Sequence, residues 1–595
     1  MKRIVSLLLV LALMSGTLTA LTSCGAPKDN GAEIHIYLGA QVFDFDPSDY
    51  YVSANAEQIL SLVYEPLFSV NKRGKIKCAA AKKYDVDKDE NKIVITLRES
   101  YWSDNLQVRA ADFVYAWCNR IIDSTYPNPA AALFLDIVGV EDVLRGTGNI
   151  SDVGIKATEM DQITITYKEG ADYKRILRNL ASVATAPVRQ DIVEPAETYW
   201  SKSSPITNGA FKVSTYNRST GVFELARNVG YHQDPTVKDY DNKVRPGLLY
   251  GNFKFEGNEV TLGYDDIKNK TIFIMADAPI SEREAYEKKA EVADHTSTYT
   301  YVFNTGKALF ADVNVRLALS LAIDRAKIAE AIVFGKAADG FIPDVSGGAK
   351  DAIISADSDM PAAKQYLAKA DQAVVAANKS FTLLIDSDEQ SAKIAEIVKA
   401  AWTELGFDVT VTVAEPVETE IDGMTVVDSG IQYAIKNASY GSADFDVIAV
   451  DWQMFCRDAL PGLASLTSTL NGMGKEQIAG TPSNGKDPAD PDYVAGVPDS
   501  SKQRSNITGW SDSKYDALVA EALAETNKKE RAKKLAEAEE YLMEQMPVCP
   551  LVFNQSFAFV GSKIAKFKYD GHGNFILTNV KLRGYRKYLK PEDED

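Results

Sequence analysis

Cysteine and histidine are scarce in this chain of 595 residues. The cysteines lie at wide, irregular spacing without a C-x-x-C pattern for metal or redox chemistry. They are Cys24, Cys78, Cys118, Cys456 and Cys549. The histidines are His35, His232, His295 and His572, none at metal-ligand spacing from another. The sequence therefore predicts no metal site, and it leaves open whether the last four cysteines form disulfides or stay buried free thiols.

The sequence motifs of common enzymes are also missing. There is no G-x-S-x-G, no G-x-x-x-x-G-K-[ST] and no H-E-x-x-H, and so few histidines offer little to Ser-His-Asp catalysis. Carboxylates are so numerous that spacing alone nominates no glycosidase pair. We therefore expect a protein that is not an enzyme and needs no cofactor, and we keep a secreted carbohydrate hydrolase as the enzyme alternative.

Positive charge is in deficit. Lys and Arg number 65 against 83 Asp and Glu, which gives a net charge of −18 and opposes a nucleic-acid partner. The 45% hydrophobic and 25% charged residues are typical of a soluble globular protein. The length is about four times the usual size of one domain, so we expect two or more domains.

Long apolar runs are absent after the first residues, and we expect no membrane span in the body of the protein. The N-terminus has the pattern of a bacterial export signal: Lys2 and Arg3, a short apolar stretch over 7–14, and a small-residue cleavage site. That site, Leu21-Thr-Ser-Cys24, resembles the lipobox of bacterial lipoproteins. The resemblance implies that residues 1–23 are removed and that acyl chains on Cys24 anchor an extracytoplasmic protein to the cell membrane. An ordinary secreted protein is the alternative.

Hydrophobic periodicity predicts a mixed α and β fold. Alternation predicts strands over 33–38 and 92–97, and an apolar stripe four residues apart, Phe113, Trp117 and Ile121, predicts a helix that begins near Ala110. These large aromatic residues are more typical of a core than of a ligand site. Further expected elements are helices over 56–64, 315–323, 515–524 and 527–546, a β-α-β unit over 381–385, 391–405 and 408–413, and a long loop over 472–509.

Several ordered motifs are similar to those of one family. They include Asp46-Pro with Gln58-Ile-Leu-Ser-Leu-Val-Tyr-Glu-Pro-Leu67, Ile95-Thr-Leu-Arg-Glu-Ser-Tyr-Trp-Ser-Asp104 with Ala111-Asp-Phe-Val-Tyr-Ala-Trp117, Val315-Arg-Leu-Ala-Leu-Ser-Leu-Ala-Ile-Asp324, and Asp444-Phe-Asp-Val447 with Trp452. The chain resembles the extracytoplasmic solute-binding proteins of peptide-type ABC importers over about residues 33–587.

The resemblance implies an α/β, two-lobed clamshell, like periplasmic binding proteins, with an extra subdomain in the first lobe. After a tether over 24–32, lobe I would comprise 33–70, 190–304 and 550–595, the extra subdomain 71–189, and lobe II 305–549. The implied ligand is an oligopeptide and the implied partners are ABC permease subunits, with a monomer as the expected state. Closure of such lobes would trap the solute between them.

The resemblance also implies site residues. The strand over 446–455 would pair with the ligand backbone, with Trp452, Gln453 and Met454 at the cleft, and Tyr50, Tyr51 and Ser53 would face it from the other lobe. A core or surface position is the alternative for the tryptophan and the tyrosines.

Two departures from the family pattern concern the ligand. Many peptide binders carry an acid three positions after this tryptophan for the peptide amine, and here that position is Phe455, with Asp458 and Asp451 as possible substitutes. The family stretch S-P-Y-A corresponds to Asn128-Pro-Ala-Ala131. An oligosaccharide or a metal chelate in the same cleft is therefore an alternative, as is a surface adhesion or signalling receptor.

Overall fold

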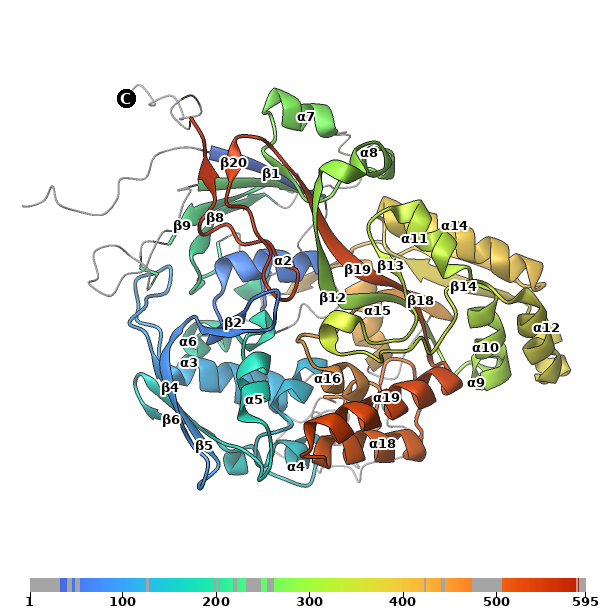
Figure 1. The fold of residues 1–595 in the computed structure, drawn as a ribbon, viewed down its shortest axis with the longest axis horizontal. Helices are drawn as coiled ribbons and strands as arrows, with labels where there is room; N and C mark the ends of the chain where they lie inside the picture. Colours follow the sequence, from blue (N-terminus) through green and yellow to red (C-terminus); the bar gives the residue numbers. More distant parts are fainter. Residues whose placement is uncertain are drawn as a thin grey trace, which may run out of the picture.

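The fold consists of two α/β bodies that lie side by side, and two long strands run between them (Figure 1). It comes from a computed structural model. The structure describes residues 33–39, 45–48, 54–124, 128–195, 199–201, 204–217, 222–228, 230–231, 248–253, 262–421, 424–439, 445–472, 506–584 and 587.

One continuous sheet passes through both bodies. Within the described residues it has 11 strands, ten of them in the order β15-β14-β18-β12-β19-β11-β1-β10-β9-β8, with β13 paired to β19. The bounds are β15 Asp408–Val413, β14 Ser380–Ile385, β18 Val447–Gln453, β12 Ala290–Phe303, β19 Val548–Val560, β11 Ile274–Met275, β1 Glu33–Gly39, β10 Leu248–Phe253, β9 Val222–Arg227, β8 Phe211–Asn217 and β13 Lys336–Ala337.

Strands β12 and β19 connect the two bodies. They run antiparallel, and the start of β12 pairs with the end of β19 next to β11, whereas the end of β12 pairs with both β18 and the start of β19. The register shifts between Asp294 and Thr298, about halfway along β12. Residues 295–303 of β12 are all buried, which explains why the sequence there, rich in Thr, Tyr and Val, does not alternate between polar and apolar residues.

A separate four-stranded antiparallel sheet follows the first part of the chain, in the order β4-β5-β7-β6. Strand β5 alternates between buried and half-buried residues, as its sequence predicts. The bounds are β4 Ala81–Asp87, β5 Lys92–Leu97, β7 Gln162–Thr166 and β6 Ile155–Glu159, and a small hairpin of β2 Phe68–Val70 and β3 Ile76–Cys78 precedes them. This sheet lies within the segment predicted as the extra subdomain.

The predicted aromatic helix is present and lies in the core. Helix α3, Ala110–Tyr115, continues into the π-helical segment η1, Ala116–Ile122, and Phe113 and Trp117 are both 0% exposed. The Trp117 indole donates to the Thr185 backbone carbonyl at 2.8 Å. These residues therefore pack the first body, as the sequence indicates, and do not face a ligand.

The predicted β-α-β unit is confirmed in the second body. Strands β14 and β15 are parallel, with Ser380 opposite Asp408 and Ile385 opposite Val413, and α14, Glu389–Glu404, connects them. Asp388 caps α14 by accepting from the Ser391 amide at 2.8 Å. The other helices of this body are α9 Ala308–Ala311, α10 Val313–Leu321, α11 Arg325–Ile332, α12 Met360–Lys369, α13 Gln372–Ala377, α15 Gly430–Ser439, α16 Ala459–Ala464, α18 Ser513–Ala524 and α19 Lys528–Gln545.

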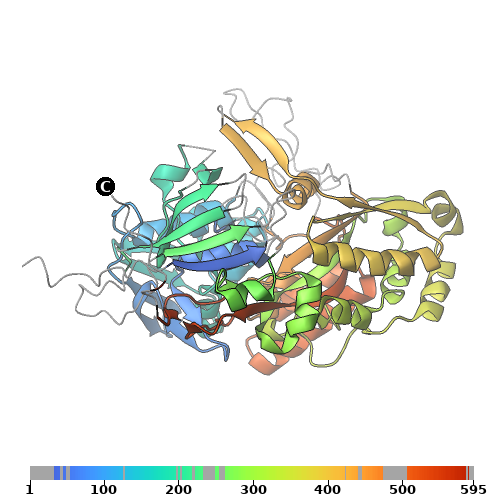
Figure 2. The same cartoon turned by 90° about the horizontal axis from the view of Figure 1, so that it is seen from above.

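A two-stranded hairpin of β16, Val417–Ile421, and β17, Met424–Asp428, stands apart from the large sheet. It leaves the second body after β15 and projects above the region between the two bodies (orange in Figure 2). Strand β17 also contacts the short segment η5, Tyr199–Ser201, which belongs to the first body. The hairpin is thus one of several places where the two bodies touch.

The described cysteines, Cys78, Cys118, Cys456 and Cys549, are all free. The last three are buried, so the free-thiol alternative holds for this part of the chain. The predicted long loop over 472–509 lies largely outside the described residues.

Candidate ligand-binding site

The strand predicted to bind the ligand is β18, in the middle of the large sheet beside β12. Its Trp452 lies in the interior of the second body, with 7% of its surface exposed. The indole packs edge-on against Phe341 at 5.6 Å between ring centroids and donates to the Ser465 hydroxyl at 3.2 Å. The indole is therefore enclosed by residues of the second body, and its role at the cleft stays a prediction.

Gln453 and Met454 are also buried. Gln453 is 1% exposed, and its amide lies 3.3 Å from the Asp451 carbonyl. The Met454 amide donates to the Thr296 carbonyl at 2.9 Å, which extends the pairing with β12 by one residue. The backbone pairing with β12 thus continues to the last residue before the turn.

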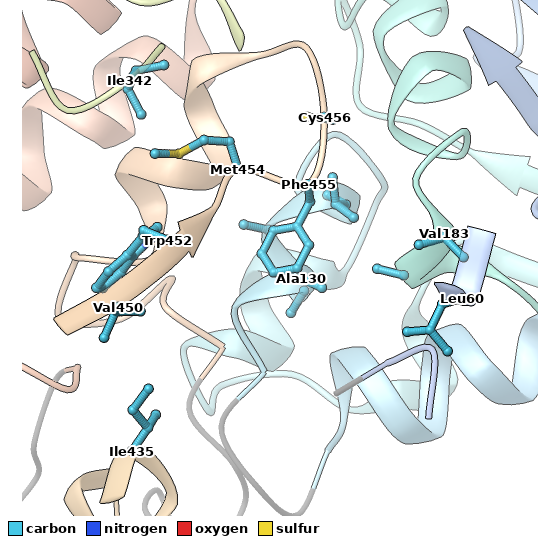
Figure 3. Close-up of a cluster of buried hydrophobic side chains, with 14 of the residues drawn as sticks. Leu60, Ala130, Val183, Ile342, Ile435, Val450, Trp452, Met454, Phe455 and Cys456 are labelled. Carbon is cyan, nitrogen blue, oxygen red and sulfur yellow. The ribbon is translucent and has the colours of Figure 1, made fainter. Parts of the chain in front are cut away.

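Phe455 follows at the turn after β18. Its φ is +59°, a left-handed conformation that is rare for a bulky residue, and its side chain is 3% exposed. Figure 3 shows the ring directed from the second body toward Ala130 and Val183 of the first body. Ala130 belongs to η2, Pro129–Phe134, which contacts α16. The two departures from the family pattern, Phe455 and residues 128–131, thus meet where the two bodies touch.

Polar contacts between the two bodies surround this apolar contact. The Asn128 amide donates to the Gly472 carbonyl at 2.7 Å, and Arg145 Nη1 donates to Thr469 Oγ1 at 2.8 Å. On the other side, Arg457 Nη1 donates to the Gly571 carbonyl at 2.7 Å. The bodies are therefore in contact on both sides of Phe455.

Asp458 lies beyond this turn and is engaged within the protein. Arg531 donates to both of its carboxylate oxygens, at 2.8 and 2.7 Å, and the Leu460 amide donates to Oδ1 at 3.1 Å. Burial alone would raise the pKa of Asp458, but Arg531, with Arg175 of the first body, lowers it. Because both oxygens are occupied, we do not propose Asp458 as a replacement for the amine-binding acid.

Asp451 is in a different environment. It is partly exposed, and its Oδ1 accepts from the Asn554 amide at 2.7 Å. Burial raises the pKa of Asp451 to about 7, and the nearby Asp388 and Asp386 add to that increase. This carboxylate has no ion-pair partner among the described residues.

Two acidic residues that the sequence reasoning missed lie close to Asp451. Asp386 and Asp388 directly follow β14, which is parallel to β18, so both strands bring carboxylates to the same edge of the sheet. Burial, together with the charge of Asp388, raises the pKa of Asp386 to about 6. The sequence shows both acids directly after the predicted strand 381–385. Such a position is informative because ligands of α/β sheets bind outside the carboxyl ends of parallel strands.

A second buried polar group lies where the first body meets the turn after β18. The Glu57 carboxylate accepts from the Asn574 amide at 2.9 Å, and its Oε2 lies 3.7 Å from His295 Nε2. Burial raises the pKa of Glu57 to about 8 and lowers those of His295 and His572 to about 4 and 3. Within the described residues, no three His, Cys, Asp or Glu are arranged to hold a metal ion.

The remaining predicted residues, Tyr50, Tyr51, Ser53 and Cys24, lie outside the described residues. Among the described helices, none combines the length and apolar character of a membrane span.

Two lobes joined by two crossing strands, with buried and recessed polar groups where the lobes meet, define a solute-binding protein. The family of bacterial extracellular solute-binding proteins, family 5, matches residues 75–474, and the chain belongs to it. The resemblance predicted from the motifs is thereby confirmed, and so is the prediction that the protein is not an enzyme, since members of this family are binding proteins.

The chain is also similar in sequence to individual solute-binding proteins. The chain is 23% identical to the oligopeptide-binding protein OppA of Bacillus subtilis, over 83% of each chain. It is 26% identical to the periplasmic murein peptide-binding protein MppA of Escherichia coli, over 83% of this chain and 82% of the relative. It is also 22% identical to the probable deoxycholate-binding periplasmic protein YgiS of Escherichia coli, over 90% of each chain.

Solved structures confirm the two-lobed fold. A structure of Escherichia coli MppA superposes with a TM-score of 0.70 at 22% identity, covering 93% of this chain and 99% of the other. Haemophilus influenzae OppA in complex with the peptide RPPGFSPFR gives 0.71 at 19% identity, with the same coverage. The unliganded open form of MppA gives 0.52 at 22% identity, covering 94% of this chain and 98% of the other.

Proposed function

We propose that this protein is a lipid-anchored receptor that captures an oligopeptide between its two lobes and delivers it to the permease of an ABC importer. The observation that carries the proposal is the pair of crossing strands, β12 and β19, in a chain of this family. Two strands that cross side by side allow one lobe to rotate against the other without breaking the core of either lobe.

The lobe arrangement described here supports closure as the capture step. The lobes touch through Phe455 and through polar contacts on both sides of it. The higher TM-score with the peptide complex than with the open form, 0.71 against 0.52, agrees with a closed arrangement. A permease that recognises only the closed form would accept only loaded receptors.

We propose the lobe boundaries given by the sequence, with one refinement. The pairing of Thr298 to Phe303 with β18 ties the end of β12 to the second lobe, so we place the hinge at the register shift between Asp294 and Thr298. The antiparallel sheet β4-β5-β7-β6 would form the extra subdomain.

The lipid anchor is proposed from the lipobox-like sequence that ends at Cys24. Expression in a bacterium with lipoprotein processing should place the wild-type protein in the membrane fraction, and Cys24→Ser should release it. Equal membrane association of both proteins would contradict the anchor and leave the ligand assignment untouched.

The ligand class is tested by native mass spectrometry of the purified protein, followed by a thermal-shift screen of peptides and saccharides. Bound peptides and a rise in Tm with peptides alone are expected, because a ligand that binds only the folded state stabilises it. A rise with saccharides but not with peptides would overturn the oligopeptide assignment.

A further inference from the structure

The first body contains a pocket that the proposed capture of a peptide does not use. Its volume is about 380 Å³, within the range of small-molecule pockets, and its lining includes Lys72, Arg73 and Lys568. We call it the basic pocket and define it by these three cations. By the proposed boundaries, its lining residues belong to the first lobe and to the start of the extra subdomain. The basic pocket is therefore a different place from the proposed cleft between the lobes.

Two segments that are far apart in the sequence form the walls of the basic pocket. One is the turn between β2 and β3, residues 71–75, and the other is residues 567–569, which follow β20, Ile564–Ala565. Figure 1 shows the chain after β20 passing close to β2, and the Gly571 amide donates to the Val70 carbonyl at 2.9 Å. The pocket thus depends on a long-range contact of the folded protein.

The turn between β2 and β3 has a fixed shape. Asn71 Oδ1 accepts from the Arg73 amide at 2.9 Å and from the Lys75 amide at 3.0 Å. The Gly74 amide donates to the Asn71 backbone carbonyl at 2.7 Å, and Gly74 has a φ of +71°, which glycine adopts without strain. These contacts hold Lys72 and Arg73 next to each other at the corner of the turn.

Aromatic rings line the other wall. Tyr569 is buried, and its hydroxyl donates to the Glu291 backbone carbonyl at 3.0 Å, which ties this wall to the start of β12. The partly exposed Phe567 packs edge-on against Tyr569 at 5.2 Å between ring centroids. Lys72 Nζ lies 5.2 Å from the centroid of the Tyr569 ring. The aromatic wall therefore contacts a cation of the turn and adds an apolar surface beside it.

The positive charge of the basic pocket is not neutralised by the protein. None of its three cations forms an ion pair within the described residues. The nearby Asp294 already accepts from Lys336 and from Gln555, both at 2.9 Å. Glu291 also lines the pocket, and this one carboxylate against three cations leaves two positive charges in excess. The excess contrasts with the net charge of −18 of the whole chain.

The arrangement of the cations favours one kind of anion. A carboxylate is planar, has two oxygens and is satisfied by a single guanidinium. The cations of the basic pocket come from two walls and approach a bound group from different directions. A phosphate ester has three terminal oxygens and carries a charge of about −1.5 to −2 at pH 7, which matches the excess of positive charge. The pocket therefore suits a phosphate group better than a carboxylate.

We propose that the basic pocket binds the phosphate group of an organic phosphate, with Lys72, Arg73 and Lys568 as the contacting cations. The source is a soluble phosphate ester or the headgroup of an anionic phospholipid, which share this chemistry. The proposed lipid on Cys24 keeps the first lobe near such headgroups, because residues 24–32 span at most ~30 Å before β1 begins. The proposal goes beyond the proposed function, because it concerns a second site outside the cleft.

The test measures the binding of glycerol 1-phosphate by isothermal titration, with glycerate as the carboxylate counterpart. Cosedimentation with vesicles of phosphatidylcholine, alone or mixed with phosphatidylglycerol, measures lipid binding. All proteins are the full chain with Cys24→Ser, so that the proposed acyl anchor does not attach them to every vesicle. The pocket variant adds Lys72→Gln and Lys568→Gln. The matched control adds Lys327→Gln and Lys399→Gln, two exposed lysines of the second body that form no ion pair among the described residues.

We expect glycerol 1-phosphate, the phosphatidylglycerol vesicles or both to bind the parent protein and the control. The pocket variant should bind the same probe ~10- to 100-fold more weakly, because it lacks two charged donors. Binding of glycerol 1-phosphate without binding to the vesicles assigns a soluble phosphate ester. Binding to the vesicles that requires phosphatidylglycerol assigns the lipid headgroup.

The proposal is overturned if neither probe binds the parent protein. It is also overturned if glycerate binds as tightly as glycerol 1-phosphate, or if the control loses as much affinity as the pocket variant. Circular dichroism of each variant confirms that it is folded.

Discussion

Asp451 and Asp458 occupy the two sides of one turn and have opposite electrostatic environments. Asp458 is held by both guanidinium donors of Arg531, which lowers the pKa of its carboxyl despite burial. Asp451 receives only the neutral Asn554 amide, and burial raises its pKa to about 7. The same residue type is therefore a structural ion in one position and an uncompensated carboxylate in the other.

This difference decides how much each acid would gain from a cation. A carboxylate that already has an arginine gains little from a second cation, whereas a desolvated carboxylate without a partner gains a full ion pair when a cation arrives. The distances of Asp451 and Asp458 from Trp452 along the sequence do not show which of the two acids is paired with a cation. The two acids differ because α19 supplies the charged Arg531 to Asp458, whereas β19 supplies only the neutral Asn554 to Asp451.

The largest effect is expected from Arg531→Ala, which would leave Asp458 buried without its cation. The folded state should lose about 3–5 kcal/mol of stability at pH 7. Because the pKa of Asp458 is lowered in the wild type, its contribution to stability is present at neutral pH and is lost as the pH falls through that pKa. Urea unfolding at pH 7 and at acidic pH should show the penalty shrinking as Asp458 becomes protonated.

The double variant Asp458→Leu with Arg531→Met is the control for this prediction. Replacing both charges by apolar side chains should restore most of the lost stability. A single variant that unfolds like the wild type would show that the ion pair contributes little.

An intermediate effect of the opposite sign is expected from Asp451→Asn. With a folded pKa of about 7 and a much lower unfolded pKa, Asp451 makes stability fall as the pH rises from about 4 to 7. The asparagine cannot ionise, so the variant should be more stable than the wild type by about 1–3 kcal/mol at pH 8 and similar to it at pH 4. Thermal unfolding across this range measures the difference, and a difference that does not change with pH would show that Asp451 is not desolvated.

The smallest effect is expected from Asp386→Asn. Asp386 raises the pKa of Asp451 less than Asp388 does, so its removal should lower that pKa by less than about one unit. Carbon NMR of the Asp451 carboxyl follows the titration directly. An unchanged titration would show that Asp386 and Asp451 do not interact electrostatically.

The sequence predicted the elements whose residues carry their own pattern. The alternation of residues 92–97, the aromatic stripe of Phe113 and Trp117, and the β-α-β unit around α14 all appear as expected. Asn527 and Pro547 likewise marked the ends of α19, which runs from Lys528 to Gln545. These predictions hold because hydrophobic period, capping and chain breaking act over a few neighbouring residues.

The long-range packing of the candidate site could not be predicted from the sequence. The resemblance implies that β18 binds the ligand, which stays a prediction, and it could not show that Trp452 packs against Phe341 and Ser465, because these residues come from other parts of the chain. Asp458 was considered for the amine because nothing near it in the sequence shows that Arg531 lies beside it. Asp386 was passed over because its link to Asp451 depends on the parallel pairing of β14 with β18.

The sequence by itself determined the family, the α/β fold class, the absence of enzyme chemistry and the local elements, since each depends on residue order or on short-range periodicity. Only the tertiary structure decided which of these two acids is neutralised by a cation. That decision depends on desolvation and on charges brought together over long chain separations, and these long-range contacts give Asp458 an arginine and leave Asp451 without one.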